Sequence, residues 1–207
     1  MKEDKEVVEI IEEKENQKNK LKDFLIYVFD IIAFLVFVLG LVLLVRIFLF
    51  NPFTVVGHSM DPTFKEGDFI VVDKISPRFS DFERGDIIVF VPPQKDVNYI
   101  KRIIGMPGET IKLNDGYVYV CDGDGENCER LDEPYLENQG VTGPECNVDE
   151  FEVGSGGYFV LGDNRDQSTD SRCCFGLGCY DGTEYVLKDE DILGKVSLRI
   201  FPDFNRF

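Results

Sequence analysis

The sequence contains no tryptophan and only one histidine, His58, among its 207 residues. A catalytic triad of the Ser-His-Asp type would therefore have to use His58, and a zinc site could take only one histidine ligand. Cysteine pairs with the Cys-x2-Cys spacing, another common source of zinc ligands, are also absent. This composition argues against a zinc enzyme.

Basic residues are scarce, with 22 Lys and Arg against 39 Asp and Glu and a formal net charge of −17. From position 52 onward, 30 acidic residues oppose 15 basic ones. Such an acidic body repels phosphate backbones, and no local stripe of basic side chains interrupts it. We therefore expect no nucleic-acid partner and interpret the acidic residues as a solvated surface.

Aromatic and turn-forming residues are plentiful, with 18 Phe, 8 Tyr, 19 Gly and 9 Pro. Most of the Gly and Pro lie after position 50, which is typical of a turn-rich body built mainly from strands. The phenylalanines and tyrosines supply large side chains for its core. Residues 51–207 suit one globular domain of this kind.

Residues 24–50 form a long apolar run in which Asp30 and Arg46 are the only charged residues. At about 1.5 Å per residue, a helix of this length crosses a hydrocarbon core of about 30 Å. The run lacks the polar face that a buried helix of a soluble protein would show. We predict one transmembrane helix over residues 24–50, preceded by a charged tail over residues 1–23.

A cleavable signal peptide is the alternative, because charged residues precede the apolar run. The run is longer than the apolar core of a signal peptide, and no Ala-x-Ala site follows it. Four lysines lie between positions 14 and 22, whereas the other flank offers only Arg46 before Lys65. The positive-inside rule therefore predicts a cytoplasmic N-terminus and an extracytoplasmic body.

All six cysteines fall in the predicted extracytoplasmic part: Cys121, Cys128, Cys146, Cys173, Cys174 and Cys179. An even number in an oxidising compartment indicates disulfides. The short spacings 121–128 and 174–179 would allow local loops, but fifteen pairings are possible and the sequence leaves the choice open. Residues 122–127 alternate oxygen side chains as a calcium loop does, yet they lack the rest of an EF-hand, so we expect a stapled turn.

Ser59 is a candidate nucleophile because it follows an extended apolar stretch and lies just before a turn containing Pro62. Serines in turns are common, so its position alone is weak evidence. A serine hydroxyl also needs a base. His58 is poorly placed for this role, because neighbouring side chains in an extended segment point in opposite directions.

Lys101 is the better base candidate. It lies in the strand-like run 99–104 between apolar and β-branched neighbours. Burial disfavours the ammonium form and lowers the pKa of a lysine toward neutrality, where the neutral amine can act as a base. The alternative is a lysine on an edge strand whose amine reaches solvent.

A polar loop over residues 162–172 follows the strand-like segment 158–161. It has too many hydrogen-bonding side chains for a plain turn. Asp163, Asp170 and Arg172 could form a charge-paired network, and Ser168 could exchange a hydrogen bond with a neutral lysine. A purely structural loop is the other interpretation.

Three segments together resemble the conserved boxes of bacterial type I signal peptidases: GHSMDPT from residue 57, YIKRIIGMPGE from residue 99 and GDNRDQSTDSR from residue 162. They occur in this order behind an N-terminal apolar run. The resemblance covers residues from about 52 to 201 and is weaker between about 114 and 157. It implies a catalytic domain of antiparallel β-sheets over residues 51–207, with a smaller, variable β-subdomain over about 114–157.

By this resemblance Ser59 is the acyl-forming nucleophile and Lys101 the general base of a serine endopeptidase. The Ser59 amide would donate to the oxyanion, and Gly57 stands where other members place a helping side-chain hydroxyl. Met60 would pack beside the dyad and Ser168 would hydrogen-bond Lys101. The supporting network would consist of Asp163, Asp170 and Arg172.

The resemblance also implies substrates and location. Apolar side chains would line shallow pockets that accept small residues at the first and third positions before the cut; these are Phe53, Val55, Ile70, Val89 and Ile100. Substrate backbone would add as a strand to the segment before Ser59. The substrates would be exported preproteins, cleaved after Ala-x-Ala-like sites without metal or cofactor.

The expected location is the bacterial cytoplasmic membrane, where lipid and the secretion translocon would be the other partners. Lys101 marks the bacterial branch, since the endoplasmic-reticulum enzymes carry histidine at this position. Two other classes compete with this prediction. A self-cleaving Ser/Lys repressor would need a DNA-binding domain, and an inactive membrane scaffold would not need both Ser59 and Lys101.

Overall fold

The computed structural model describes residues 2–48, 50–75, 77, 79–179 and 185–207, with side chains from residue 19 to 43 and from residue 52 onward within these ranges. It divides into two compact units, Met1–Ile47 and Phe48–Phe207. The first unit consists of helix and the second of strands and short 3-10 helices. Each unit is described by itself.

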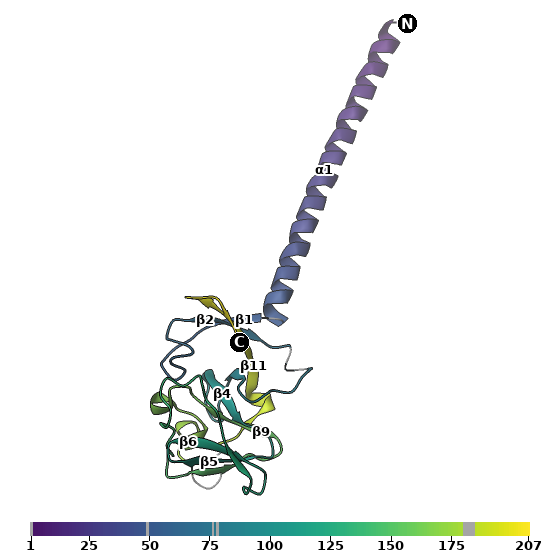
Figure 1. The fold of residues 1–207 in the computed structure, drawn as a ribbon. Coiled ribbons are helices and arrows are strands. Elements are labelled where there is room, and N and C mark those ends of the chain that lie inside the picture. The colour runs from purple at the N-terminus through teal and green to yellow at the C-terminus, as the bar shows by residue number, and fades with distance from the viewer. Residues whose placement is uncertain (1, 49, 76, 78, 180–184) are drawn as a thin grey trace. The chain divides into compact units, whose positions relative to one another are not determined.

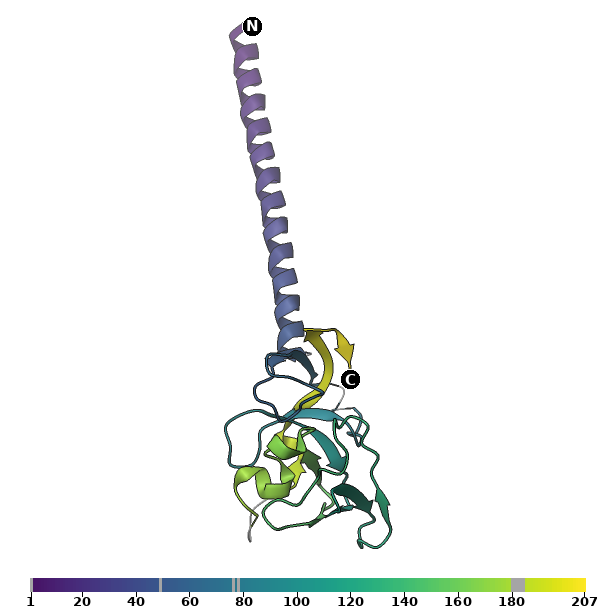
Figure 2. The same cartoon turned by 60° about the vertical axis from the view of Figure 1, so that its left-hand side comes forward.

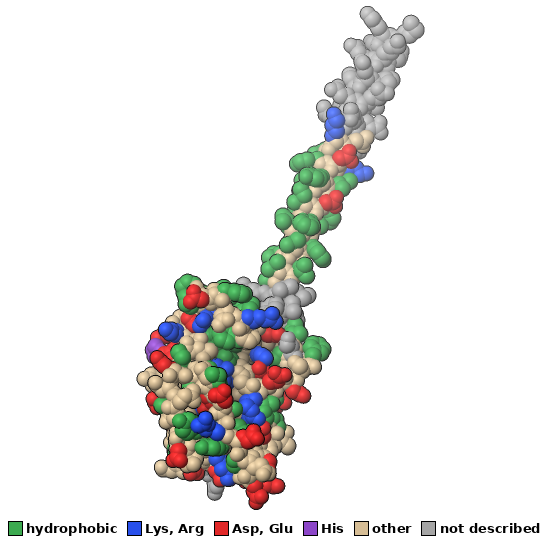
Figure 3. Space-filling model, viewed as in Figure 1, with side chains coloured by type: hydrophobic (Ala, Val, Ile, Leu, Met, Phe, Trp, Pro, Cys, Tyr) green, Lys and Arg blue, Asp and Glu red, His purple; other side chains and the backbone are tan. Residues whose placement is uncertain are grey.

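Helix α1 (Lys2–Phe48) runs through both the predicted tail and most of the predicted membrane segment (Figure 1). Its stretch Asn19–Leu43 has a mean hydropathy of 2.8 and none of its residues is buried, so by length and composition it could span a membrane. Hydrophobic side chains cover most of the visible face of this stretch, and charged side chains lie toward its N-terminal end (Figure 3). The chain is already in a strand at Phe50, two residues before Pro52, which disfavours helical backbone in its predecessor.

The larger sheet has eight antiparallel strands in the order β1-β2-β11-β3-β4-β9-β10, with β12 added to β11. The predicted class, mostly antiparallel β with one N-terminal apolar helix, is therefore confirmed. The strands are β1 (Phe50–Thr54), β2 (Phe69–Asp73), β3 (Ile87–Phe90), β4 (Tyr99–Gly105), β9 (Gly157–Leu161), β10 (Leu187–Lys188), β11 (Ile192–Phe201) and β12 (Asn205–Arg206).

The smaller sheet has four antiparallel strands in the order β7-β6-β5-β8. They are β5 (Thr110–Asn114), β6 (Tyr117–Cys121), β7 (Cys128–Arg130) and β8 (Glu150–Glu152). In both views of the ribbon, β5 and β6 lie at the opposite end of the body from β1 and β2 (Figures 1 and 2). The described part of the body also contains the 3-10 helices η2 (Arg165–Gln167), η3 (Ser171–Gly176) and η4 (Asp189–Asp191).

Local sequence explains the hairpin of the smaller sheet. Asp115 and Gly116 connect β5 to β6 with φ values of 50° and 84°. An Asp-Gly pair suits a two-residue turn that needs positive φ at both positions, and such a turn matches the right-handed twist of the strands. The alternating apolar residues of both strands can then face the same core.

The two sheets share one hydrophobic cluster. Ile104, Phe159 and Leu161 from the larger sheet pack in the same buried group as Ile111 and Phe151 from the smaller one. Two other buried clusters serve the larger sheet. The smaller sheet therefore buries its apolar face against the larger sheet.

Gly105, at the end of β4, shows how closely the two sheets approach. A Cβ atom at this position would lie 2.8 to 2.9 Å from side-chain carbons of Ile111, Val153 and Phe159. Such contacts are too short for carbon atoms, so only glycine fits. This explains the first of the two glycines in the second sequence box.

All six cysteines are paired, as Cys121–Cys128, Cys146–Cys173 and Cys174–Cys179. Two of the pairs close the short loops that the spacing allowed. The third joins residues 27 positions apart, which the sequence did not single out. Between Cys121 and Cys128, Asp122 accepts hydrogen bonds from the Glu126 amide and the Asn127 side chain, so residues 122–127 form the expected stapled turn.

Candidate active site

The loop that carries Ser59 is anchored on both sides. Val55 exchanges backbone hydrogen bonds with Asp68 and Gly67, and the Phe64 amide donates to the Met60 carbonyl. The Met60 and Phe64 side chains are fully buried. Between these anchors the chain turns at Gly57 with φ +85°, a left-handed conformation that favours glycine.

Lys101 lies on β4, which has β3 on one side and β9 on the other. Its side chain is only 3% exposed, so the interpretation of Lys101 as a solvent-reaching edge lysine is wrong. Nζ donates to Ser59 Oγ at 2.7 Å and to the Ile100 carbonyl at 2.7 Å. The fold thus brings together the two residues that the sequence selected.

Burial changes the acidity of Lys101. Loss of hydration disfavours the ammonium and lowers its pKa from 10.5 to about 8, although the negative charges of Asp170 and Asp163 oppose the shift. A substantial fraction of the amine is therefore neutral just above neutral pH. A neutral amine can accept a proton from the serine hydroxyl that it contacts.

His58 faces other partners. Its two ring nitrogens lie 3.2 Å from an Asp61 oxygen and 3.6 Å from a Glu66 oxygen, and the side chain is 56% exposed. The described hydrogen-bond partner of the Ser59 hydroxyl is Lys101. This geometry agrees with the rejection of a histidine-based triad.

Asp163 does not join Asp170 and Arg172 in the single charged network that the sequence suggested. Its buried carboxylate accepts two hydrogen bonds from Arg102, at 2.9 and 2.6 Å, and another from Thr63. The Arg102 guanidinium also lies 3.8 Å from the centre of the Tyr135 ring. Sequence reasoning missed Arg102, although its place beside Lys101 put its side chain on the opposite face of the same strand.

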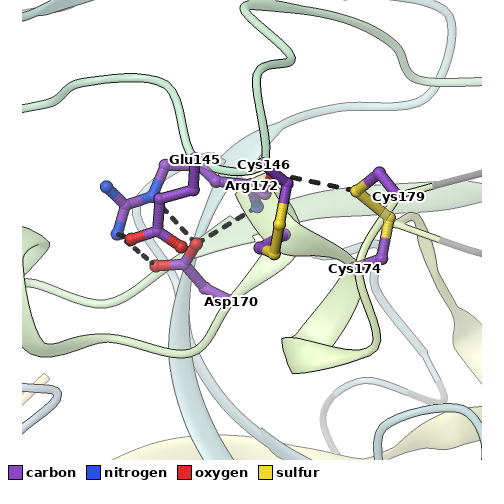
Figure 4. Close-up of a disulfide and its surroundings, with 7 residues drawn as sticks. Glu145, Cys146, Asp170, Arg172, Cys174 and Cys179 are labelled. Atoms are coloured by element: carbon purple, nitrogen blue, oxygen red, sulfur yellow. Dashed lines mark hydrogen bonds and ion pairs between the residues drawn. A yellow bond between two sulfur atoms is a disulfide. The ribbon is translucent and has the colours of Figure 1, made fainter.

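Asp170 and Arg172 form the second buried pair (Figure 4). Arg172 Nε donates to Asp170 at 2.9 Å, and Glu145 lies 3.1 Å from the same guanidinium. Asp170 also accepts from the Gly162 amide at 3.1 Å. The charged groups raise the pKa of Arg172 despite its burial, so the guanidinium stays charged and paired with Asp170, whose carboxylate holds Gly162 at the other end of the polar loop.

A third buried pair joins Arg165 to Glu133. Arg165 Nε donates to the Gly162 carbonyl at 2.9 Å, and its terminal nitrogens contact Glu133 and Thr142. Glu133 is 2% exposed. No sequence motif pointed to Glu133 or Thr142, since both lie in the segment where the family resemblance is weakest.

The structure corrects one predicted contact. The Ser168 hydroxyl is buried but forms no hydrogen bond with any described group, so the expected bond to Lys101 is not formed. Ser168 nevertheless lies close to the nucleophile loop. A Cβ atom on Gly162 would overlap both Ser168 Oγ and the Ser59 carbonyl oxygen, which explains why glycine opens the third box.

A groove of about 700 Å³ lies beside the dyad. Its walls come from the segments 53–59 and 96–101, with further side chains from β2, β3 and the polar loop. It includes Ser59 and Lys101 themselves. The groove also gathers every residue predicted for substrate binding: Phe53, Val55, Ile70, Val89 and Ile100.

The position of Gly57 is open. A Cβ atom there would meet nothing within 4 Å among the described atoms, and Gly57 lines the groove. As predicted from the sequence, glycine supplies no side-chain hydroxyl at this point. Any hydrogen bond that such a hydroxyl would give to an oxyanion would have to come from the backbone or from water.

Comparison with known proteins identifies the family. A family model described as signal peptidase, peptidase S26, matches residues 28–201. Signal peptidase I of Bacillus licheniformis is 38% identical over 172 residues, which cover 80% of this chain and 86% of the relative. Signal peptidase I U of Bacillus subtilis strain 168 is 35% identical over 191 residues, covering 90% and 91%.

A solved structure is also similar. The crystal structure of a signal peptidase I from Enterococcus faecalis V583 shares 32% sequence identity, with a TM-score of 0.42, and the match covers 57% of this chain and 98% of that one. The family model and the Bacillus relatives extend over most of the chain. The chain therefore belongs to the signal peptidase family, peptidase S26, and is a hydrolase of the signal peptidase I kind that removes signal peptides.

Proposed function

We propose that the chain is a membrane-bound serine endopeptidase in which Ser59 is the nucleophile and Lys101 the general base. The observation that carries this proposal is the 2.7 Å hydrogen bond between Lys101 Nζ and Ser59 Oγ. Burial of Lys101 supports it, because the lowered pKa of about 8 makes the neutral base available. The rest of the mechanism follows from this pair.

Neutral Lys101 takes the hydroxyl proton while Ser59 Oγ attacks the carbonyl carbon of the scissile bond. The tetrahedral intermediate collapses as the carbon–nitrogen bond breaks, and Lys101 returns the proton to the departing amine of the mature protein. The signal peptide is now an ester on Ser59. Lys101 then deprotonates a water molecule, whose oxygen attacks the carbonyl carbon of this ester. The carbon–Oγ bond breaks, Lys101 returns the proton to Ser59 Oγ, and the signal peptide leaves.

Specificity for small-x-small sites is part of the proposal. Ile70, Val89 and Ile100 contribute apolar walls to the groove beside Ser59, which favour short apolar side chains over long or charged ones. The segment after β1 lines the same groove. An extended substrate could pair with its backbone, which would present alternate side chains to the pockets.

Helix α1 would hold the enzyme in the bacterial cytoplasmic membrane, with the N-terminus in the cytoplasm. The apolar stretch Asn19–Leu43 and the lysines before it support this orientation. Exported preproteins would reach the body on the outer side. The disulfides agree with an oxidising compartment.

The test is cleavage of a preprotein in liposomes, with the new N-terminus sequenced. Wild type should cut after a small-x-small site, while Ser59→Ala and Lys101→Ala should lose at least about a thousandfold in kcat/KM. Ser155→Ala and Lys112→Ala serve as matched controls on the body and should keep full activity. Full activity of Lys101→Ala would overturn the mechanism, and cleavage after large side chains would overturn the specificity.

A further inference from the structure

One peptide unit in the nucleophile loop contains both the His58 carbonyl and the Ser59 amide. The peptide bond between them is trans, since the cis bonds in the structure are at Pro62 and Pro202. In a trans peptide the C=O and N–H groups point in opposite directions. Any group that holds the His58 carbonyl therefore also sets the direction of the Ser59 N–H.

Asn164 holds this carbonyl. Its side-chain Nδ2 donates to the His58 carbonyl at 3.0 Å, and its backbone amide donates to the Ser59 carbonyl at 3.1 Å. One residue thus donates hydrogen bonds to two consecutive carbonyl groups of the loop that carries Ser59. The His58 carbonyl also accepts from the Asp61 amide at 3.2 Å, within the turn itself.

The Ser59 amide is left available on the other side. It donates to no acceptor within the part of the chain that the structure describes, and Ser59 lines the substrate groove. Gly57, which lies just before this peptide unit, has a conformation and an open neighbourhood that restrain the loop little. The direction of the amide therefore depends on contacts from outside the loop.

Asn164 is itself rigidly mounted. The residue before it, Asp163, is bound by Arg102, and the residue after it, Arg165, is bound by Glu133. Both ion pairs are buried. The ion pairs on either side restrain the backbone of Asn164. Its side-chain amide and its backbone N–H can therefore hold the His58 and Ser59 carbonyls in fixed positions.

We propose that Asn164 positions the oxyanion donor by orienting the His58–Ser59 peptide so that the Ser59 N–H faces the groove. Gly57 offers no side-chain donor, so this N–H carries more of the oxyanion stabilisation. The inference rests on the proposed role of Ser59 as nucleophile. Asn164 acts through the backbone and does not itself contact the reacting atoms.

The first test compares steady-state kinetics of the full chain on a signal-peptide substrate. Asn164→Ala and the isosteric Asn164→Asp should lower kcat by roughly 10- to 100-fold and leave KM within about twofold, since misplaced oxyanion donors weaken only the transition state. Asp166→Ala, an exposed truncation in the same loop, is the matched control and should behave as wild type.

The second test uses a peptide aldehyde with small side chains and the corresponding peptide alcohol. In the aldehyde adduct, Ser59 Oγ bonds to the carbonyl carbon, the π electrons move to the carbonyl oxygen, and Lys101 keeps the serine proton. The resulting oxyanion needs the Ser59 amide, whereas the alcohol only fills the groove. Asn164→Ala should weaken aldehyde binding in proportion to the fall in kcat and leave alcohol binding unchanged.

The two proposals fail in different ways. If the aldehyde forms no covalent adduct with wild type, the proposed role of Ser59 is wrong. If wild type forms it and both Asn164 variants bind the aldehyde as tightly, the inference about Asn164 is overturned. Equal weakening of aldehyde and alcohol would also overturn it, because it would indicate general damage to the groove. If Asn164→Ala does not fold, Asn164→Asp, which keeps the shape of the side chain, provides the test of the inference.

Discussion

The two sheets of the body differ in how their polar residues are used. The larger sheet carries Lys101 and, beside it, buried charged groups that are paired within the interior. The smaller sheet has strand β7 fully exposed and a local disulfide at its end. The larger sheet thus keeps charged side chains buried and paired, whereas the smaller sheet has an edge strand that is exposed to solvent.

The comparison changes when the connection between β7 and β8 is included. This segment, residues 131–149, sends Glu133 and Thr142 to Arg165, and Tyr135 to the face of Arg102. It also sends Glu145 and Cys146 to the region of Arg172 (Figure 4). The polar loop over residues 162–172 is therefore held by a segment with little regular structure.

This arrangement links residues 131–149 to the polar loop. Arg165 and Arg172 carry buried guanidinium groups in the polar loop, and their partners Glu133 and Glu145 belong to a segment with little regular structure. Removing those partners should disturb the polar loop, whereas changes on the exposed strand β7 should not. Variants within residues 131–149 and within strand β7 distinguish these two parts of the body.

The largest effect is expected at Glu133. Glu133→Ala would leave the buried Arg165 guanidinium without its anionic partner, which costs about 3 to 5 kcal/mol of unfolding free energy. Urea unfolding in detergent, followed by tyrosine fluorescence because tryptophan is absent, measures the change. The exposed Glu137→Ala is the control. Equal unfolding free energies of the two variants would contradict a stabilising role for the Glu133–Arg165 ion pair.

The disulfides should differ with the length of the loop that they close. Cys146→Ser/Cys173→Ser removes a link across 27 positions and should cost about 3 to 4 kcal/mol, against about 2 kcal/mol for Cys121→Ser/Cys128→Ser across 7. Only the first double variant should also lower kcat, since Cys173 follows Arg172. Unfolding curves and kinetics on the same preparations test both points. Loss of activity in the Cys121/Cys128 variant alone would contradict the stronger link of the 146–173 disulfide to activity.

Lys101 should make stability depend on pH. Its folded pKa of about 8 lies below the ordinary 10.5, so between these values the unfolded chain binds more protons and stability rises with pH. Relative to Lys101→Met, wild type should gain about 3 kcal/mol from pH 8 to 10.5. Unfolding of both proteins across this range checks the difference. If the unfolding free energies of the two proteins changed with pH in the same way, folding would not lower the pKa of Lys101.

The smallest effect is expected on the exposed strand β7. Glu129→Gln should change unfolding free energy by less than about 0.5 kcal/mol and leave kcat/KM unchanged, because the side chain is exposed and belongs to none of the described buried ion pairs. The same unfolding and kinetic assays apply. A loss comparable with that of Glu133→Ala would mean that the exposed sheet also supports catalysis.

Local pattern and spacing were sufficient for part of this molecule. The apolar run predicted helix, the Gly- and Pro-rich body predicted strands, and the three boxes selected Ser59 and Lys101, which the fold brings into contact. These signals depend on neighbours in the chain or on short motifs. They require no knowledge of which distant segments meet.

The missed features all depend on distant segments. The partner of Asp163 is Arg102 rather than Arg172, and the partner of Arg165 is Glu133, 32 positions away. Nothing in the sequence distinguishes the buried Glu133 from the other acidic residues among the chain's 39 Asp and Glu. The unpaired Ser168 hydroxyl also shows that a motif can place a side chain near a site without fixing its hydrogen bond.

The proposed use of Lys101 as a neutral base is tested most directly by the pH dependence of kcat/KM for preprotein cleavage between pH 6 and 10. Since only the neutral amine accepts the serine proton, the rate should rise about tenfold per pH unit below the Lys101 pKa of about 8 and become level above it. A rate that is level from pH 6 to 10 would contradict the account.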